Sequence, residues 1–332
     1  MTSAGHNFER GRSLLEMMER IRAFEEQACL AAERDQLVLG AIHPSIGQEA
    51  VAAGIMHNLS KEDILLSTHR GHGHTLAKGA SSLAMMRELL GREGGCCGGK
   101  GGSMHIADFD VGMLGANGVV GANITIAAGA AHAIKLLGDK RIVVDIFGDG
   151  AINRGPFLEG MNWAVVFQLP ILFVCEDNQY SATTRTTTMT AGDGAAARAV
   201  SLGMRSTTVD GNDVELIADT AADIAARLRA GGAPEFLHAK TYRRTGHTSF
   251  DPASYRPANE ATEEEKKSDP IKRQRAILQA AGMSEADVQA LHENAQKEMI
   301  NILKEAADTP FPANETAFKD VQDIGSPAVE AY

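Results

Sequence analysis

Polar side chains that could bind a metal ion follow two apolar runs of the sequence. The run 142–147 ends in a Gly-Asp-Gly turn around Asp149, and the run 171–175 ends in a Glu-Asp-Asn turn that contains Asn178. In a right-handed βαβ unit both strands end at the same edge of the sheet, where ligands of open α/β sheets bind. Carboxylate and amide oxygens suit Mg²⁺, which completes its shell with phosphate oxygens and water. Asp149 and Asn178 are therefore predicted to share a Mg²⁺–diphosphate site.

Three other interpretations compete with a Mg²⁺–diphosphate site. A dinucleotide site requires G-x-G-x-x-G, and this loop has two of the three glycines, with an acid that would face a pyrophosphate without a metal. Residues 94–100 match most of a Walker A motif, but Gly101 stands where the motif requires Ser or Thr. The third interpretation is that the Asp and Asn turns bind nothing. This is common for isolated motifs, and less common when two such turns lie at adjacent strand ends. A helix predicted from about Asn153 would point its amino end at the phosphates.

Histidines gather after a predicted strand, where His69, His72 and His74 flank Arg70. Such a group could bind a transition metal. A strand exit with alternating glycines and a planar, permanently charged guanidinium fits phosphate binding better. The adjacent thiols of Cys96-Cys97 lie in a glycine run. They could form a redox switch, but two small residues in a tight loop are the simpler interpretation, and they are assigned no role.

These residues need a framework, and the hydrophobic pattern predicts alternating strands and helices. Strands are expected at 64–67, 142–147, 171–175, 204–209 and 235–242, and helices at about 8–34, 48–59, 81–90, 119–137, 153–167 and 213–228. Two later helices have start signals, Ser268-Asp269-Pro270 for the first and Ser284 with Asp287 for the second. The predicted fold class is α/β, a mostly parallel sheet flanked by helices, with helical N- and C-terminal extensions.

Glycine is concentrated in one segment, because residues 91–121 hold 11 of the 34. This predicts a loop with left-handed backbone or one that a ligand approaches closely. A second loop is expected from Thr245 to about Glu260. The chain divides into an N-terminal helical arm over 1–40, a phosphate- and Mg²⁺-binding α/β domain over 41–260, and a C-terminal helical extension and tail over 261–332.

Composition excludes several classes of protein. The 332 residues carry 32 basic and 43 acidic side chains, a net charge of −11, which disfavours nucleic acid as a partner. Four cysteines without C-x-x-C spacing do not make a disulfide scaffold and suit a reducing compartment. Neither a secretory signal nor a membrane-spanning apolar stretch is recognised. We therefore expect a soluble, cytoplasmic protein with no membrane partner.

Six motifs follow one another in a recognisable order. They are H-P-S-I-G-Q-E-A from His43, T-H-R-G-H-G from Thr68, G-K-G-G-S-M-H from Gly99, G-A-N-G-V-V-G from Gly115, the pair Asp149 and Asn178, and R-T-G-H from Arg244 with Asp251-Pro252 beyond. Together they resemble the alpha subunit of the thiamine-diphosphate-dependent component of 2-oxo acid dehydrogenase complexes, of the acetoin or pyruvate dehydrogenase type. The resemblance covers about residues 10–307, and implies the thiamine-diphosphate-binding fold with thiamine diphosphate and Mg²⁺ as cofactors.

Residue by residue, the resemblance implies two catalytic histidines that would face the thiazolium and the substrate, His43 and His247. It implies three Mg²⁺ ligands, namely Asp149, Asn178 and the main-chain carbonyl of Tyr180. The further cofactor contacts would be His69 and Arg70 on the phosphates, Gly118 and Val120 on the aminopyrimidine, and Gly150 and Ala151 along the diphosphate.

The resemblance also implies an activity and its partners. The enzyme would cleave the carbon–carbon bond beside a carbonyl, in acetoin or in pyruvate with decarboxylation, and pass the acyl fragment to lipoamide on an acyltransferase. In the family the carboxylate that activates the cofactor belongs to a beta subunit, so we expect a heterotetramer of two alpha and two beta chains. A branched-chain 2-oxo acid as substrate, and a non-catalytic cofactor-binding module, are the alternatives.

The sequence departs from the family pattern in ways that bear on these roles. Asp177 stands where most relatives have Asn, so it adds a charge that either tightens metal binding or faces outward. His69 replaces a tyrosine usual in pyruvate-type subunits and, with the segments 71–74 and 113–117, favours the acetoin type. Ser254 falls where mammalian relatives carry a phosphorylated serine, in the predicted loop.

Overall fold

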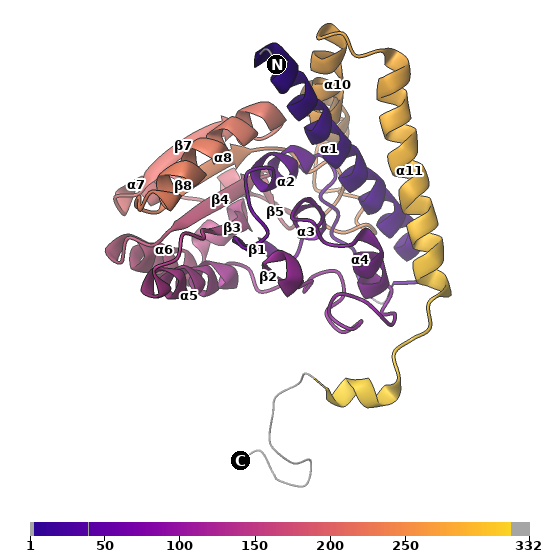
Figure 1. Ribbon diagram of the computed structural model, residues 1–332, viewed down its shortest axis with the longest axis horizontal. Coiled ribbons are helices and arrows are strands. Elements are labelled where there is room, and N and C mark those ends of the chain that lie inside the picture. Colours follow the sequence, from indigo (N-terminus) through magenta and orange to yellow (C-terminus); the bar gives the residue numbers. More distant parts are fainter. Residues whose placement is uncertain (1–2, 39, 320–332) are drawn as a thin grey trace.

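The protein centres on a parallel six-stranded sheet, seen in a computed structural model that describes residues 3–38 and 40–319 (Figure 1). The strands lie in the order β2-β1-β3-β4-β8-β7, and every neighbouring pair is parallel. Their bounds are β1 Ile64–Thr68, β2 Met113–Asn117, β3 Val143–Gly148, β4 Ile171–Asp177, β7 Arg205–Asp210 and β8 Glu235–Lys240. The predicted α/β class is confirmed, and β2 is a strand within the glycine-rich segment that the sequence pattern missed.

Helices α5 (Ala122–Leu137), α6 (Gly155–Val166) and α7 (Gly194–Ser201) cover one face of the sheet. Because side chains alternate along a strand, Val143 and Phe147 of β3 point to this face. There they join a core that includes Ile124 of α5 and Met161 of α6. We call α5 and α6 the α5–α6 layer.

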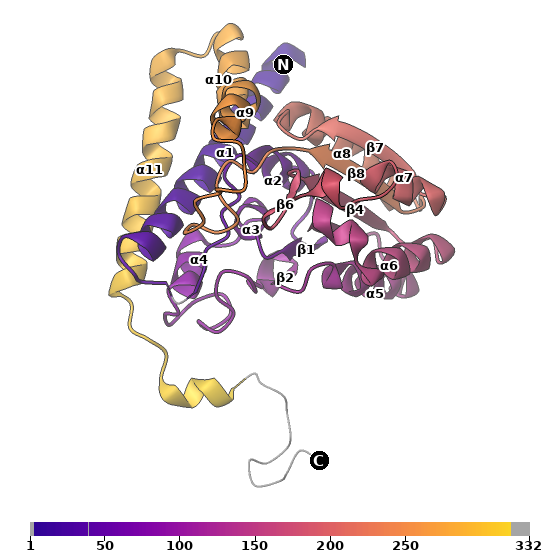
Figure 2. The same ribbon diagram turned by 180° about the vertical axis from the view of Figure 1, so that it is seen from behind.

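The opposite face carries a larger helical layer built from both ends of the chain. It contains α1 (Ser3–Glu33), α2 (Glu49–Met56), α3 (His72–Ala77), α4 (Ser82–Leu89), α8 (Val214–Arg229), α10 (Pro270–Ala280) and α11 (Glu285–Asp308). Figure 2 shows α11 beside the later part of α1, where Arg20 of α1 pairs with Glu298 of α11. The apolar stripe of α1, which was predicted from its helical spacing, is buried here with Met299 of α11. We call this the α1–α11 layer.

Local signals set the starts of the late helices as predicted. The Asp269 carboxylate accepts from the backbone N–H groups of Ile271 and Lys272, and Pro270 takes the first position of α10. Ser284 accepts from the N–H of Asp287 at the start of α11. Helix α9 (Glu260–Ser268) was not predicted, because it has no apolar period. Charged pairs three residues apart run along it instead.

Two expectations need correction near the site. The segment after β1 was read as a strand exit with alternating glycines, but it forms α3 from His72 onward. The helix expected from about Asn153 begins at Gly155 as α6, because a 3₁₀ turn over Asp149–Asn153 comes first.

A short hairpin of β5 (Tyr180–Ser181) and β6 (Thr184–Arg185) follows β4. In the part of the chain described here, no helix is both long and apolar enough to cross a membrane.

Candidate active site

A cavity of about 250 Å³ opens at the carboxyl ends of β1, β3 and β4, where the sequence predicted a ligand. Strands β1, β3 and β4 are neighbours in the sheet, so the loops that follow them converge there. The fold brings together every residue to which the sequence analysis gave a catalytic, cofactor or metal role, since all of them line this one cavity: His43, His69, Arg70, Gly118, Val120, Asp149, Gly150, Ala151, Asn178, Tyr180 and His247.

Asp149 lies at the end of β3 and is almost fully buried. Burial, together with the nearby charge of Asp177, raises the pKa of its carboxyl to about 6. The hydroxyl of Thr186, which the sequence analysis did not single out, donates a hydrogen bond to Asp149 Oδ2. The hydrogen bond from Thr186 does not offset the cost of burying this carboxylate as an anion. A bound cation would stabilise its charged form.

Asn178 and Tyr180 are fixed beside it by the turn that ends β4. The backbone N–H of Tyr180 donates to Asn178 Oδ1 at 3.2 Å, and Asn178 Nδ2 donates to Gln48 Oε1 at 3.0 Å. The amide is therefore oriented by two contacts, and its oxygen keeps acceptor capacity. The Tyr180 hydroxyl donates to Glu260 of α9, so this side chain is held from outside the sheet.

Asp177 turns away from this pair. Its Oδ2 lies 2.8 Å from His238 Nε2 on β8, and its Oδ1 accepts from the N–H of Gln179 at 3.0 Å. Of the two expectations for this residue, an outward-facing carboxylate fits these contacts. Its charge still reaches Asp149, whose pKa it raises.

The glycines of the site leave room where side chains would block it. A Cβ on Gly150 would overlap the Oγ of Ser181 in the neighbouring hairpin. Gly121 has φ +85°, a left-handed conformation, where the loop from β2 enters α5. These loops bring backbone groups, including those of Gly118 and Ala151, to the cavity wall.

Two buried arginines supply positive charge. Arg70 donates to the carbonyls of Pro44 at 2.8 Å and His247 at 3.0 Å, so it ties the segments that carry two of the site histidines. Burial and the charge of Arg243 lower the pKa of Arg70 to about 9. Its contact to phosphate remains a prediction. Arg243 was missed because it sits in an Arg-Arg run typical of exposed segments, yet it is 1% exposed and lines the cavity.

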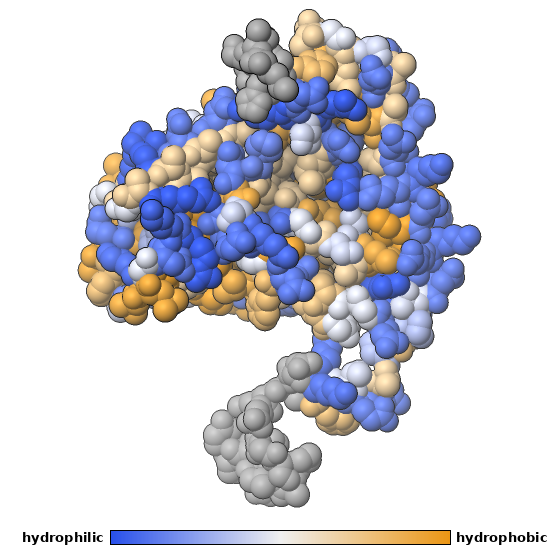
Figure 3. Space-filling view, viewed as in Figure 1, coloured by the Kyte–Doolittle hydropathy of each residue, from blue (hydrophilic) through white to orange (hydrophobic). Residues whose placement is uncertain are grey.

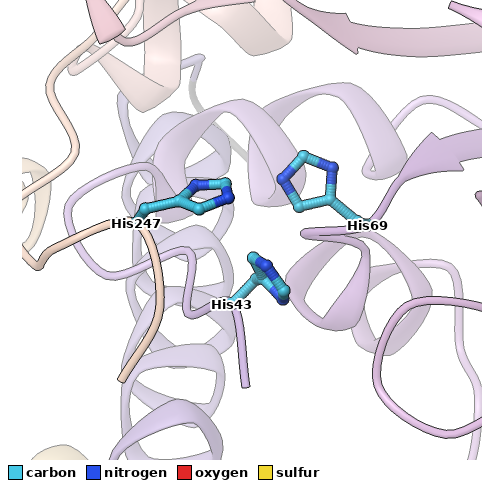
Figure 4. A group of neighbouring side chains, drawn as sticks. All are labelled: His43, His69 and His247. Carbon is cyan, nitrogen blue, oxygen red and sulfur yellow. The ribbon is translucent and has the colours of Figure 1, made fainter. Parts of the chain in front are cut away.

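His43, His69 and His247 come from three separate segments, and their rings point toward one another (Figure 4). The ring centroids lie 4.8 Å apart for His43 and His69, 4.9 Å for His43 and His247, and 5.7 Å for His69 and His247. Burial, reinforced by the charge of Arg70, lowers the pKa of His43 to about 3, of His69 to about 2 and of His247 to about 4. All three are neutral imidazoles at neutral pH.

The contact between Arg70 and His247 sets what His247 can do. Arg70 Nη2 lies 3.3 Å from His247 Nδ1, and a guanidinium only donates, so Nδ1 is assigned as the acceptor and Nε2 carries the proton. A metal-ligating histidine instead donates from its second ring nitrogen. His247 is thus arranged to donate a hydrogen bond to an oxygen of a bound molecule, and the histidine trio is poorly suited to a metal ion.

The other histidines of the motif after β1 face the protein interior. His72 contacts Glu25 Oε2 through Nδ1 and Ser103 Oγ through Nε2, at 2.8 and 2.9 Å. His74 lies 2.8 Å from Ser67 Oγ. A zinc site formed by His69, His72 and His74 is therefore not supported.

Several polar atoms at the cavity are buried without a hydrogen-bond partner among the described residues. They include His43 Nδ1 and Arg243 Nε, whereas Glu176 Oε1 lies 3.5 Å from His74 Nε2. Glu176 is a third residue that the sequence analysis did not assign, although it precedes Asp177 at the end of β4. Because buried polar groups are normally satisfied, these orphaned atoms indicate a polar, charged ligand. The donor set fits a diphosphate with a divalent cation.

The sequence is similar to known proteins along most of the chain. Residues 16–315 match the family described as dehydrogenase E1 component. The chain is 39% identical to the alpha subunit of acetoin:2,6-dichlorophenolindophenol oxidoreductase from Cupriavidus necator, with 92% of this chain and 91% of that protein covered. The Bacillus subtilis protein of the same name is also 39% identical, with coverage of 93% and 92%. Pyruvate dehydrogenase E1 component subunit alpha of Zymomonas mobilis is 37% identical, with coverage of 93% and 88%. The chain therefore belongs to the dehydrogenase E1 component family.

Proposed function

We propose that the chain is the alpha subunit of a thiamine-diphosphate-dependent dehydrogenase that acts on acetoin or pyruvate and delivers the acyl fragment to lipoamide. The observation that carries this is the single cavity lined by Asp149, Asn178, Arg70 and the three neutral histidines. The alpha-subunit relatives named above support it, since the E1 family depends on thiamine diphosphate. Acetoin is the preferred substrate, because two relatives with acetoin in their names are 39% identical.

The residues divide between holding and reacting. Asp149, Asn178 and the carbonyl of Tyr180 would hold Mg²⁺, and Gly150 and Ala151 would flank the diphosphate. Gly118 and Val120 would contact the aminopyrimidine. When bound, thiamine diphosphate supplies a nucleophilic carbon and an electron sink for cleavage beside a carbonyl.

The histidines act as neutral groups. His247 donates from Nε2 to a substrate oxygen, as its contact with Arg70 requires. His43 lies 4.9 Å from it between ring centroids and has an unpartnered, buried Nδ1 that can hold or accept a proton. His69 completes the wall beside them.

The surface beside the cavity supports a partner subunit. Val119 and Val120 are 63% and 44% exposed in the loop that lines the cavity. They lead into α5, whose outer face forms with α6 a groove of about 570 Å³ that includes Leu136 and Trp163. Figure 3 shows hydrophobic surface over this part of the molecule, at the lower left. A beta subunit seated on the α5–α6 layer would cover this surface and close the cavity from the Val119 side.

The direct test is titration of the chain and its beta subunit with thiamine diphosphate in the presence of Mg²⁺. Asp149→Asn is expected to weaken Mg²⁺-dependent binding by at least about 100-fold, since even outer partners of a metal site contribute 10–100-fold. Asp139→Asn, on an exposed loop, is the control. Unchanged affinity in Asp149→Asn would refute the metal assignment.

Turnover separates the remaining readings. The reconstituted enzyme should oxidise acetoin faster than pyruvate or a branched-chain 2-oxo acid. His247→Ala should reduce kcat with cofactor affinity retained, whereas equal turnover would favour a module that binds cofactor without catalysis.

A further inference from the structure

The glycine-rich loop before the cavity is built around one buried carboxylate. Glu88, at the end of α4, accepts four backbone N–H bonds from this loop. Its Oε2 accepts from Cys97 and Gly99, both at 2.8 Å, and its Oε1 accepts from Gly101 at 2.7 Å and Gly102 at 3.1 Å. A Cβ on Gly95 would overlap Glu88 Oε2, so the close approach requires glycine there. The backbone that carries Cys97 is therefore held in place.

Two adjacent thiols lie on this loop with different environments. The N–H of Ala107 donates to Cys97 Sγ at 3.0 Å, and the sulfurs of Cys96 and Cys97 lie within 4.8 Å of one another. The interaction between the two thiols lowers the pKa of Cys97 and raises that of Cys96, while burial and the charges of Glu88 and Asp108 act to raise both. Both residues are half-buried, so a small molecule can reach them. Held in place by the loop, Cys97 is positioned as the attacking sulfur, and Cys96 lies beside it as the residue that can close the bond.

Glu88, Cys96 and Cys97 place ligand atoms within 4.8 Å of one another, which raises the question of a metal site. The four N–H bonds occupy the lone pairs of the Glu88 carboxylate. Only the two thiols then remain, which is too few for the tetrahedral shell that zinc prefers. The geometry favours dithiol chemistry over a structural metal.

The loop is connected to the cavity wall. Cys97 Sγ contacts the carbonyls of His105 at 3.6 Å and Ala107 at 3.3 Å. The N–H of Gly118 donates to His105 Nε2 at 3.4 Å, and Gly118 and Met104 both line the cavity. A change at the Cys97 sulfur therefore acts on a segment that reaches the cavity within two contacts.

We propose that Cys96 and Cys97 form a thiol–disulfide exchange site for low-molecular-weight disulfides, and that its oxidation loosens the cavity wall formed by Met104 and Gly118. The Cys97 thiolate attacks one sulfur of the disulfide, which forms a mixed disulfide and expels one thiolate. Cys96 then loses its proton and attacks Cys97 Sγ, which closes the Cys96–Cys97 bond and expels a second thiolate. The dithiol loses two electrons, and the oxidant becomes two thiols.

Adjacency makes this bond easy to reverse. Neighbouring Cα atoms lie 3.8 Å apart across a trans peptide, below the 4.4–6.8 Å usual for disulfides. Such a bond is strained, and strained bonds are the readily reduced, regulatory kind. The oxidised sulfur of Cys97 also becomes a poorer acceptor for the N–H of Ala107, so the segment 104–118 loses one of its anchors.

The test uses the reduced full chain, incubated with oxidised glutathione and examined by peptide mass spectrometry. Wild type should lose two hydrogens in the peptide that carries both thiols, and dithiothreitol should restore them. Cys96→Ser should accumulate a glutathione adduct on Cys97, and Cys97→Ser should form neither product. Cys29→Ser, at a half-buried thiol whose pKa is raised by burial, should behave as wild type. Absence of the two-hydrogen loss in wild type would overturn the proposal, and no variant is needed for that result.

Hydrogen–deuterium exchange measures the second half of the proposal. Amides of residues 104–118 should exchange about 10-fold faster after oxidation, and those of α11 should not change. Unchanged exchange at 104–118 would refute the effect on the cavity wall. Neither readout needs cofactor or turnover, so these results are independent of the proposed function.

Discussion

The two helical layers on the sheet differ in the side chains that they expose to solvent. The α1–α11 layer buries its apolar side chains inward, and its surface along α11 is mostly hydrophilic (Figure 3). The α5–α6 layer buries an equally apolar inner face, yet its outer face exposes Leu136 at 79% and Leu137 at 72%. A contiguous apolar outer face marks an interaction surface. We therefore propose that a partner covers the α5–α6 layer, whereas the α1–α11 layer already buries its apolar side chains within the chain.

The layers also differ in how they bury charge. On the α1–α11 side several buried carboxylates have cationic or histidine partners, as Glu25 has His72, Glu49 has Arg22 and Asp269 has Arg244. On the α5–α6 side Asp145 of β3 shares its face with Val143 and Phe147. Its carboxyl is fully buried, and neither oxygen has a partner among the described residues. The difference between paired and unpaired charge makes opposite predictions for mutations on the two sides.

The largest effect on assembly is expected at the outer α5–α6 face. Leu136→Glu with Leu137→Glu should leave the fold intact and weaken binding of the beta subunit by more than about 100-fold, because charge placed at an apolar interface centre removes hot-spot energy. Size-exclusion chromatography with circular dichroism checks both statements. Ile300→Glu on α11, also an exposed apolar position, should have no effect. Equal losses for the two variants would remove the distinction between the layers.

Breaking a buried charge pair on the α1–α11 side comes next. Glu25→Ala removes the acceptor of Ser45 N–H, Ser45 Oγ and His72. We expect a loss of about 3–5 kcal/mol in the free energy of unfolding, because a buried group is left unpaired. Urea denaturation measures it. Glu298→Ala, in the part-exposed pair with Arg20, should cost no more than about 1 kcal/mol.

Core truncation separates inner from outer positions. Met299→Ala, at a fully buried site of α11, is expected to cost about 2–5 kcal/mol. Leu137→Ala, on the outer α5–α6 face, should stay within about 0.5 kcal/mol in the isolated chain. A comparable loss at Leu137 would show that this face is already packed within the chain.

The smallest predicted effect has the opposite sign. Burial raises the pKa of Asp145 well above its ordinary value. The free energy of unfolding is therefore least affected by Asp145 below pH about 4, where its carboxyl is protonated in both states, and it falls as pH rises. Asp145→Val should therefore raise the free energy of unfolding at pH 7 by about 1–3 kcal/mol. Thermal unfolding from pH 4 to 8 should show a flatter dependence in the variant. Asp145→Asn keeps the shape and should flatten the profile without the full gain.

Local pattern was sufficient for much of the framework. Apolar runs located β3 and β4, and capping residues located the starts of α10 and α11. Strand ends pointed to Asp149 and Asn178, because topology alone places such ends together. The family resemblance paired His43 with His247 and put His69 on the phosphates, so the convergence of all three rings was not predicted, since no spacing in the sequence relates three separate segments.

What the sequence did not reveal depends on tertiary contact. Thr186 and Arg243 reach Asp149 or the cavity from distant segments, and nothing in their local sequence marks them. Asp145 sits in a run that reads simply as a buried strand, so its lack of a partner was invisible. The polar helix α9 forms without an apolar period, and its Glu260 accepts from both Tyr180 and Tyr242.

The pairing of α1 with α11 has a consequence for how the protein is made. About 250 residues separate the end of α1 from the start of α11, which at 5–20 residues per second is roughly 12–50 s of translation. Throughout that interval the apolar stripe of α1 lacks its long companion helix. The ribosome thus releases the first helix well before the last can shield it, and nascent chains of this protein should be clients of chaperones that bind exposed apolar helices early.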